Sequence, residues 1–218
     1  MEKSTTALLW DLDGTIIDTK ESHFESWSIT LEKFGHSLGR NVFEANFGRN
    51  NQAILPAFLG FEPTPRLYDQ IVTEKEILFR KIAPQKAVLV TGVNLWLSSA
   101  KDMGLIQAVA SSASLENITT LLSAFSLLEY FDVLVPGENL PAKPEPDVFL
   151  EAAAQLDLTP GKCVVIEDST AGVKAAKRAG MACVAVVTSH SKSQLTLADV
   201  IIEDFTQPLR SILDNLPK

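Results

Sequence analysis

Two aspartates one residue apart, Asp11 and Asp13, follow a short apolar run and precede Gly14. An apolar run such as residues 7–10 that ends at a glycine turn is typical of a buried strand running into a loop. Strand alternation would direct both carboxylates to one side, although the turn can re-aim the second. Two carboxylates this close repel each other unless a cation or a shared proton intervenes. The pair could supply a nucleophile, a metal ligand and a proton donor, or it could simply be an acidic strand end.

Further polar groups follow other predicted strands of the chain. They are Ser111 and Ser112, then Lys143 in a Lys-Pro-Glu-Pro-Asp stretch, then Glu167 and Asp168. Taken singly, each has an ordinary structural explanation, because serines begin turns, lysines among prolines are solvated, and acidic residues cap helices. Taken together, they follow strands of one predicted sheet, and the carboxyl ends of parallel strands form the edge where ligands bind.

The sheet itself is predicted from apolar runs that alternate with helical patterns after about residue 88. The predicted strands are 7–10, 106–110, 133–135, 163–166 and 182–187, with a short edge strand at 200–202. The predicted helices are 93–103, 114–124, 146–156, 170–179 and a last one near 208–213. This alternation indicates an α/β protein with a Rossmann-like, doubly wound parallel sheet and helices on both faces.

Residues 19–87 differ in sequence pattern from the rest of the chain, because they show helical periodicity and no strand pattern. The helical patterns cover 22–34, 52–59 and 66–82. We therefore expect a core made of residues 1–18 and 88–218, with an inserted all-helical cap at 19–87. A cap that leaves from the carboxyl edge of the sheet would lie over the site as a lid.

The composition of the chain limits the kinds of binding partner and the cellular compartment that we expect. With 218 residues, 46% of them hydrophobic, the chain can bury a sizeable core. A net charge of -8 argues against nucleic-acid binding and against anionic membranes. No apolar run approaches the roughly 20 residues of a membrane span, and the N-terminus lacks a signal-peptide pattern. Cys163 and Cys183 lie in strand-like runs, as core residues of a reduced protein do. We expect a cytoplasmic monomer acting on a small molecule.

The motifs together resemble the haloacid dehalogenase superfamily, in the branch of β-phosphoglucomutases and small sugar-phosphate phosphatases. Asp11–Thr15 is similar to its first motif, Ser111 to the second, Lys143 to the third, and Glu167 with Asp168 to the fourth. The resemblance spans essentially the whole chain, cap included. It implies that Asp11 is the nucleophile and forms an aspartyl-phosphate. It also implies Mg²⁺, held by the Asp11 carboxylate, the Asp13 backbone carbonyl and Asp168, with Glu167 on the ion or its water.

Residue chemistry supports these roles. An ordinary aspartate is ionised at neutral pH, so Asp11 would need no base, only relief from repulsion by the phosphate. Lys143 would neutralise a phosphate oxygen, and Ser111 would hydrogen-bond the transferring group. A sugar oxygen leaves poorly unless it is protonated, so Asp13 would serve as general acid and then as base for water. Thr19, at the predicted hinge, would control Asp13.

Cap residues are expected to choose the substrate. His23 and Trp27 lie one helical turn apart and could share a face, and Lys75 is similar to a cap lysine of the mutases. Each could equally be a packing or solvated helix residue. Arg49, Asn51 and the core residue Ser112 complete the predicted substrate contacts.

The choice between phosphatase and mutase turns on the second phosphate of a bisphosphate. The loop 112–116 lacks the Lys-Asn pair with which mutases of this branch hold that group, and Arg49 is displaced from the mutase position near Asn51. The sequence therefore favours a phosphatase of small phosphorylated metabolites, sugar phosphates above all. A β-phosphoglucomutase-type mutase is the alternative, and a non-catalytic phosphate-binding or receiver-like module is a remoter one.

Overall fold

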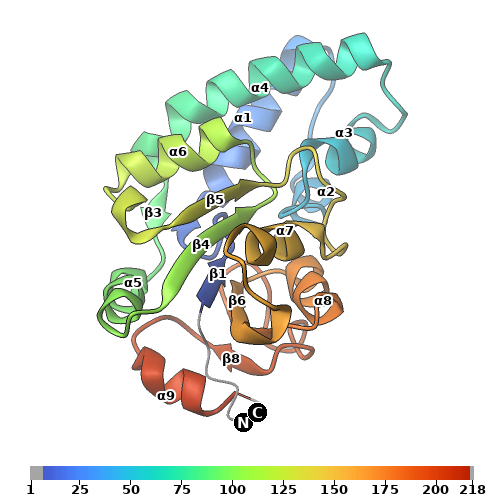
Figure 1. Ribbon diagram of the computed structural model, residues 1–218. Helices are drawn as coiled ribbons and strands as arrows, with labels where there is room; N and C mark the ends of the chain where they lie inside the picture. Colours follow the sequence, from blue (N-terminus) through green and yellow to red (C-terminus); the bar gives the residue numbers. More distant parts are fainter. Residues whose placement is uncertain (1–6, 217–218) are drawn as a thin grey trace.

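The computed structural model describes residues 7–216, in which a parallel sheet flanked by helices carries a layer of helices over one end (Figure 1). The sheet strands are β1 (Ala7–Trp10), β4 (Ile106–Ser111), β5 (Val133–Pro136), β6 (Cys163–Glu167), β7 (Ala182–Val186) and β8 (Val200–Ile202). Their spatial order is β5-β4-β1-β6-β7-β8, and every neighbouring pair is parallel. The order runs outward in both directions from β1, which makes the sheet doubly wound and puts the end of β1 at its centre.

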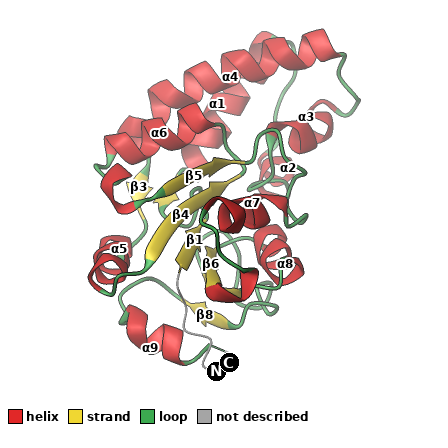
Figure 2. Ribbon diagram, in the orientation of Figure 1, coloured by secondary structure: helices red, strands yellow, loops and turns green. Residues whose placement is uncertain are grey.

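Helices cover both faces of this sheet (Figure 2). On one face lie α5 (Val93–Asp102), α6 (Leu115–Ala124) and α9 (Leu209–Asp214), and on the other lie α7 (Asp147–Gln155) and α8 (Thr170–Arg178). Strand β1 supplies both layers, because Leu8 and Trp10 pack with the first set and Ala7 and Leu9 with the second. A strand buried on both faces must be apolar throughout, which is why residues 7–10 form an unbroken apolar run.

The helical cap has a hydrophobic cluster of its own. It consists of α1 (Lys20–Lys33), α2 (Arg40–Glu44), α3 (Asn51–Leu59) and α4 (Pro65–Lys86). Trp27, Leu31, Phe43 and Leu55 are among the buried residues of its cluster. The Rossmann-like core with an inserted helical cap is thus confirmed as the fold class.

A small antiparallel sheet marks the point where the chain leaves the core and returns to it. Strand β2 (Ile17–Asp18) pairs with β3 (Val88–Leu89), on either side of the helical segment. We keep residues 19 and 87 as the proposed limits of the cap because this pairing ties its two ends together.

The structure differs from the sequence expectation in short or irregular pieces. Helix α2 and the β2–β3 pair were not expected, because runs of five and two residues are too short to show a period. Helix α4 continues to Lys86, past the expected end at 82, and contains Pro84. A proline usually ends a helix at about the preceding residue, but here it lies in the final turn.

Two composition-based expectations concern the core and the membrane. The free thiols of Cys163 on β6 and Cys183 on β7 are buried in the core. Between residues 7 and 216, no helix has both the length and the apolar character that a bilayer crossing requires.

Candidate active site

Three buried carboxylates and one lysine meet at the carboxyl edge of the sheet. Asp11 follows β1, Glu167 ends the adjacent β6, and Asp168 comes next. One carboxylate oxygen from each lies within 4.8 Å of the others. Lys143 Nζ lies 2.6 Å from Asp11 Oδ1 and 2.9 Å from Glu167 Oε1. Parallel pairing of β1 with β6 therefore brings together groups that are more than 150 residues apart in the sequence.

One lysine does not balance this cluster. Burial raises the pKa of Asp11 to about 7, with Glu167 adding to the rise and Lys143 opposing it. Burial, followed by the charges of Glu167 and Asp11, raises the pKa of Asp168 well above its ordinary value. The all-oxygen donor set and its surplus negative charge fit a hard divalent cation such as Mg²⁺. The simple expectation of an ionised Asp11 therefore requires positive charge beyond that of Lys143.

Glu167 is held by both of its oxygens. Besides the contact with Lys143, its Oε2 accepts hydrogen bonds from the backbone amides of Asp168 at 2.7 Å and Ser169 at 2.6 Å. The start of α8 packs so closely against it that a Cβ added at Gly172 would overlap the Glu167 carboxylate. The Glu167 side chain therefore orients Lys143 and fixes the backbone of Asp168 and Ser169, which follow it.

We expect Gly172→Ala to reverse the usual effect of this substitution. In a helix interior, alanine is ordinarily more stable than glycine by about 1 kcal/mol. Here the new methyl group displaces the Glu167 carboxylate, so overpacking should lower the free energy of unfolding by about 1–3 kcal/mol. Because Glu167 orients Lys143, any activity that depends on Lys143 should also fall.

Urea unfolding and turnover of Gly172→Ala and of the wild type are the measurements. A variant as stable as the wild type, or more stable, would show that the Glu167 carboxylate has room to move.

The loop after β1 sends the second aspartate in a different direction. Gly14 has φ +90°, and a side chain there would overlap the Asp168 carboxylate. Thr188 Oγ1 donates to the Gly14 carbonyl at 2.5 Å and lies 3.3 Å from Asp168 Oδ2. Glycine adopts this left-handed backbone conformation readily. The turn lets Asp13 face the cap while Asp11 faces Lys143.

Asp13 is bound by residues at the start of the cap. Thr19 Oγ1 donates to Asp13 Oδ1 at 2.6 Å, and His23 Nε2 lies 3.2 Å from the same oxygen. On the far side of the ring, Lys75 Nζ lies 3.2 Å from His23 Nδ1. An ammonium can only donate, so Nδ1 accepts and the ring proton of neutral His23 is on Nε2, directed at Asp13. His23 also stacks on Phe79, with ring centroids 4.0 Å apart.

This network favours the ionised form of Asp13. Burial acts to raise the pKa of Asp13, but His23, Thr19 and Lys75 together outweigh it, and the pKa lies below its ordinary value. Burial, helped by the charge of Lys75, lowers the pKa of His23. Burial and Lys75 thus favour the neutral form of His23, whose Nε2 hydrogen bond is one of the contacts that lower the pKa of Asp13.

The predicted site residues divide into those that line one pocket and those behind it. The pocket is lined by Asp11, Asp13, His23, Trp27, Arg49, Asn51, Lys75, Ser111, Ser112, Glu167 and Asp168, among others. Lys143 and Thr19 are buried but do not line it, because they lie behind the two aspartates that they contact. Arg49 is exposed, and its guanidinium donates to Asn46.

Two serines occupy the end of β4. Ser111 is buried and its Oγ accepts a hydrogen bond from the Ala113 amide at 3.2 Å. Ser112 Oγ donates to the carbonyl of Gly48 in the cap at 3.2 Å, so it also joins the cap to the core.

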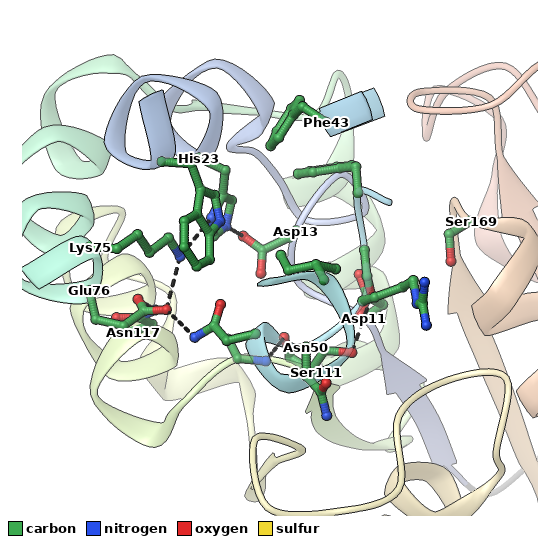
Figure 3. A pocket seen from close by; sticks show the side chains of 18 of the residues that line it. Asp11, Asp13, His23, Phe43, Asn50, Lys75, Glu76, Ser111, Asn117 and Ser169 are labelled. Carbon is green, nitrogen blue, oxygen red and sulfur yellow. Dashed lines mark hydrogen bonds and ion pairs between the residues drawn. The ribbon is translucent and has the colours of Figure 1, made fainter. Parts of the chain in front are cut away.

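Sequence reasoning missed Glu76 and Asn117, which line the same pocket. Glu76 follows Lys75 on α4, and Asn117 lies in the first turn of α6. Figure 3 shows both beside Lys75 at one end of the pocket, away from Asp11. No motif indicated them, and the only signal was the position of Glu76 next to a predicted cap residue.

The comparisons with known proteins agree with this geometry. A model of the haloacid dehalogenase-like hydrolase family matches residues 8–186, so the chain belongs to this family of enzymes. It is 32% identical over 190 residues to β-phosphoglucomutase from Bacillus subtilis (strain 168), covering 83% of this chain and 82% of that protein. It is 28% identical over 207 residues to hexitol phosphatase B from Escherichia coli (strain K12), covering 92% and 93%.

Among solved structures, a variant of CbbY from Rhodobacter sphaeroides in complex with xylulose-(1,5)bisphosphate superposes with a TM-score of 0.85. It is 27% identical, and the match covers 93% of this chain and 96% of that one. The relatives therefore include a mutase, a phosphatase and a protein seen with a bisphosphate.

Proposed function

We propose that the protein is a Mg²⁺-dependent phosphatase that hydrolyses small phosphorylated metabolites, sugar phosphates above all, through an aspartyl-phosphate on Asp11. One observation carries the proposal: Asp11 lines a pocket, is bound to Lys143 at 2.6 Å, and lies in a cluster with Glu167 and Asp168. The hexitol phosphatase and β-phosphoglucomutase relatives support a sugar or polyol phosphate as the substrate class.

Asp11 and Asp168, with the backbone carbonyl of Asp13, would hold the ion. When bound, Mg²⁺ supplies the positive charge that lets an anionic Asp11 approach an anionic phosphate. Glu167 has both oxygens engaged by protein donors, so we assign it chiefly to orienting Lys143, with any metal contact through water.

In the first half-reaction, an Asp11 oxygen attacks phosphorus and the sugar oxygen leaves with a proton from Asp13. Lys143 and Ser111 stabilise charge on the phosphoryl oxygens. In the free protein, the surroundings of Asp13 favour its ionised form. The negative charge of a bound phosphate would raise the pKa of Asp13, so that it takes up the proton that it then donates to the sugar oxygen.

In the second half-reaction, water attacks the phosphorus of the aspartyl-phosphate and Asp13 accepts its proton. The Asp11–phosphorus bond breaks, inorganic phosphate leaves and Asp11 is restored. Ionised Asp13, hydrogen-bonded by Thr19 and His23, is prepared for this role as base. Its contacts suggest that Thr19 and His23 position Asp13 rather than select the substrate directly.

We expect Asp13→Asn to lower turnover of sugar phosphates by about 10²–10⁴-fold, because an amide neither gives nor takes the proton. A para-nitrophenyl phosphate, whose leaving group needs no proton, should form the aspartyl-phosphate with a much smaller loss. Burst-phase kinetics on both substrates separates the two steps. Equal losses in the burst rate for both leaving groups would contradict the role of Asp13 as general acid.

The contents of the pocket favour a phosphatase over a mutase. Lys75 is paired with Glu76 at 2.9 Å, and Arg49 is exposed and bonded to Asn46. Among the described residues that line the pocket, none offers an unpaired buried cation for a second phosphate. The identity to a β-phosphoglucomutase keeps the mutase as the second candidate.

A screen of phosphorylated metabolites with and without Mg²⁺ tests the proposal. It should include β-glucose 1-phosphate with glucose 1,6-bisphosphate, followed by phosphorus NMR. Metal-dependent release of inorganic phosphate over many turnovers is the expected result. Conversion to glucose 6-phosphate without phosphate release would identify a mutase, and no turnover of any ester would favour a binding module.

We also propose that the enzyme works as a monomer in the cytoplasm. Two buried free thiols support a reducing compartment. Light scattering on the purified protein would test the monomer, and a larger mass would refute it.

A further inference from the structure

We infer that Glu76 makes the pocket selective for phosphate monoesters whose far end is uncharged and hydroxylated, and that it acts against substrates with a second phosphate. This inference rests on the proposed function, since it assumes that a phosphate ester occupies this pocket. It concerns the opposite end of the substrate from the bond that is broken.

Glu76 is fixed where three helices meet. Its Oε1 accepts from Lys75 Nζ at 2.9 Å and from Asn51 Nδ2 at 2.6 Å, and its Oε2 accepts from Asn117 Nδ2 at 2.5 Å. Asn117 is itself held by Arg80, whose guanidinium donates to its Oδ1 at 3.0 Å. The Glu76 side chain is only 12% exposed, yet it lines the pocket (Figure 3). These hydrogen bonds therefore hold the negative charge of Glu76 in one position in the pocket.

The carboxylate remains an anion at every pH at which an enzyme of this kind works. Burial acts to raise the pKa of Glu76, but the charge of Lys75 and the hydrogen bonds from Asn117, Lys75 and Asn51 bring it down to about 2. Lys75, which could have attracted a second phosphate, is paired with Glu76, and its other hydrogen-bond partner is His23. Among the described residues that line this end of the pocket, the charges of Lys75 and Glu76 cancel.

A second phosphate would therefore enter a partly buried pocket where the Lys75–Glu76 pair has no net positive charge, so it would lose water without gaining a cation. Any direct approach to the fixed Glu76 carboxylate would also be repulsive, and more strongly so than in water. A hydroxyl group would instead donate to it, because each carboxylate oxygen accepts more than one hydrogen bond. Trp27, Phe43 and Phe58 give the same pocket an apolar wall. Such a wall suits the C–H faces of a sugar or polyol.

Family membership leaves this point open, since one relative was solved with a bisphosphate. Specificity of this kind is a difference between two affinities, and a repulsive group is an effective way to create it. Among the described carboxylates that line the pocket, Glu76 is the one with no part in the proposed phosphoryl transfer.

The test compares matched substrate pairs, fructose 6-phosphate against fructose 1,6-bisphosphate and glucose 6-phosphate against glucose 1,6-bisphosphate, with the full-length enzyme and Mg²⁺. We expect the wild type to favour the monophosphate in kcat/KM by about 100-fold, and Glu76→Gln to shrink that ratio by about tenfold or more, mainly through KM for the bisphosphate. Glu76→Asp, which keeps the charge, should retain the preference.

Glu74→Gln is the matched control. It removes the same charge from the same helix, but from an exposed side chain that pairs with Lys33. It should leave both ratios as in the wild type. If Glu74→Gln changes the ratio as much as Glu76→Gln does, net charge rather than the pocket is responsible, and the inference fails.

Calorimetric titration of the same sugar phosphates into the Asp11→Asn variant, which lacks the proposed nucleophile, repeats the comparison without turnover. Bisphosphates that bind as tightly as monophosphates would overturn the inference, even if the Glu76 variants fail to fold. Absence of phosphate release from para-nitrophenyl phosphate would count against the proposed function alone, because the binding comparison would still decide the role of Glu76.

Discussion

Asp11→Asn should reduce phosphate release by the order of 10⁴-fold or more, the scale of loss when a nucleophile is removed. A neutral amide oxygen is a very weak nucleophile, and the neighbouring Glu167 and Asp13 carboxylates are held by other partners. Glu167 is bound by Lys143 and two backbone amides, and the Asp13 carboxylate is directed at Thr19 and His23.

This loss should come without unfolding. Replacing one of three crowded carboxylates relieves repulsion, so the thermal midpoint of Asp11→Asn should stay close to that of the wild type or rise. Asp102→Asn, an exposed aspartate at the end of α5, is the matched control and should keep full activity.

Acid-quenched intact mass spectrometry tests the covalent step directly. The wild type mixed with substrate should gain the mass of one PO₃ group, and Asp11→Asn should not. A variant that still releases phosphate at more than a few per cent of the wild-type rate would remove Asp11 from the role of nucleophile.

Lys143→Met should cost about 10³-fold in turnover, as expected when a charged group that stabilises a transition state is removed. It should also destabilise the protein. Lys143 is buried between Asp11 and Glu167, and breaking a buried ion pair by removing one partner costs about 3–5 kcal/mol. Between residues 7 and 216, no other cation of the protein forms an ion pair with Asp11 or Glu167.

Added Mg²⁺ distinguishes the two effects of this substitution. The ion should raise the thermal midpoint of Lys143→Met, since a ligand that binds only the folded state stabilises it, yet it should not restore turnover. Lys101→Met is the control, because its pairing with Glu129 is exposed, and exposed pairs contribute about 0–1 kcal/mol. Turnover of Lys143→Met within tenfold of the wild type would rule out a role in stabilising the phosphoryl group.

Local sequence patterns determined the fold class and the neighbourhood of the site. The apolar run at 7–10, the later strand–helix alternation and the helical texture of 19–87 each arise from short-range periodicity, which a sequence displays directly. The polar residues after β1, β4 and β6 could be assigned to one edge because parallel strands have a common direction. The resemblance to haloacid dehalogenases rested on these same residues.

Two features could be learned only from the tertiary structure: the charge state of Asp11 and the contacts of Glu76 at the far end of the pocket. The pKa of Asp11 depends on burial among Glu167 and Lys143, more than 130 residues away, and burial is a property of the packed chain. Glu76 meets Asn51, 25 positions away, through the packing of two cap helices, and it meets Asn117, 41 positions away, because the cap lies over the core. No spacing rule relates such positions, because their contact depends on how separate helices pack.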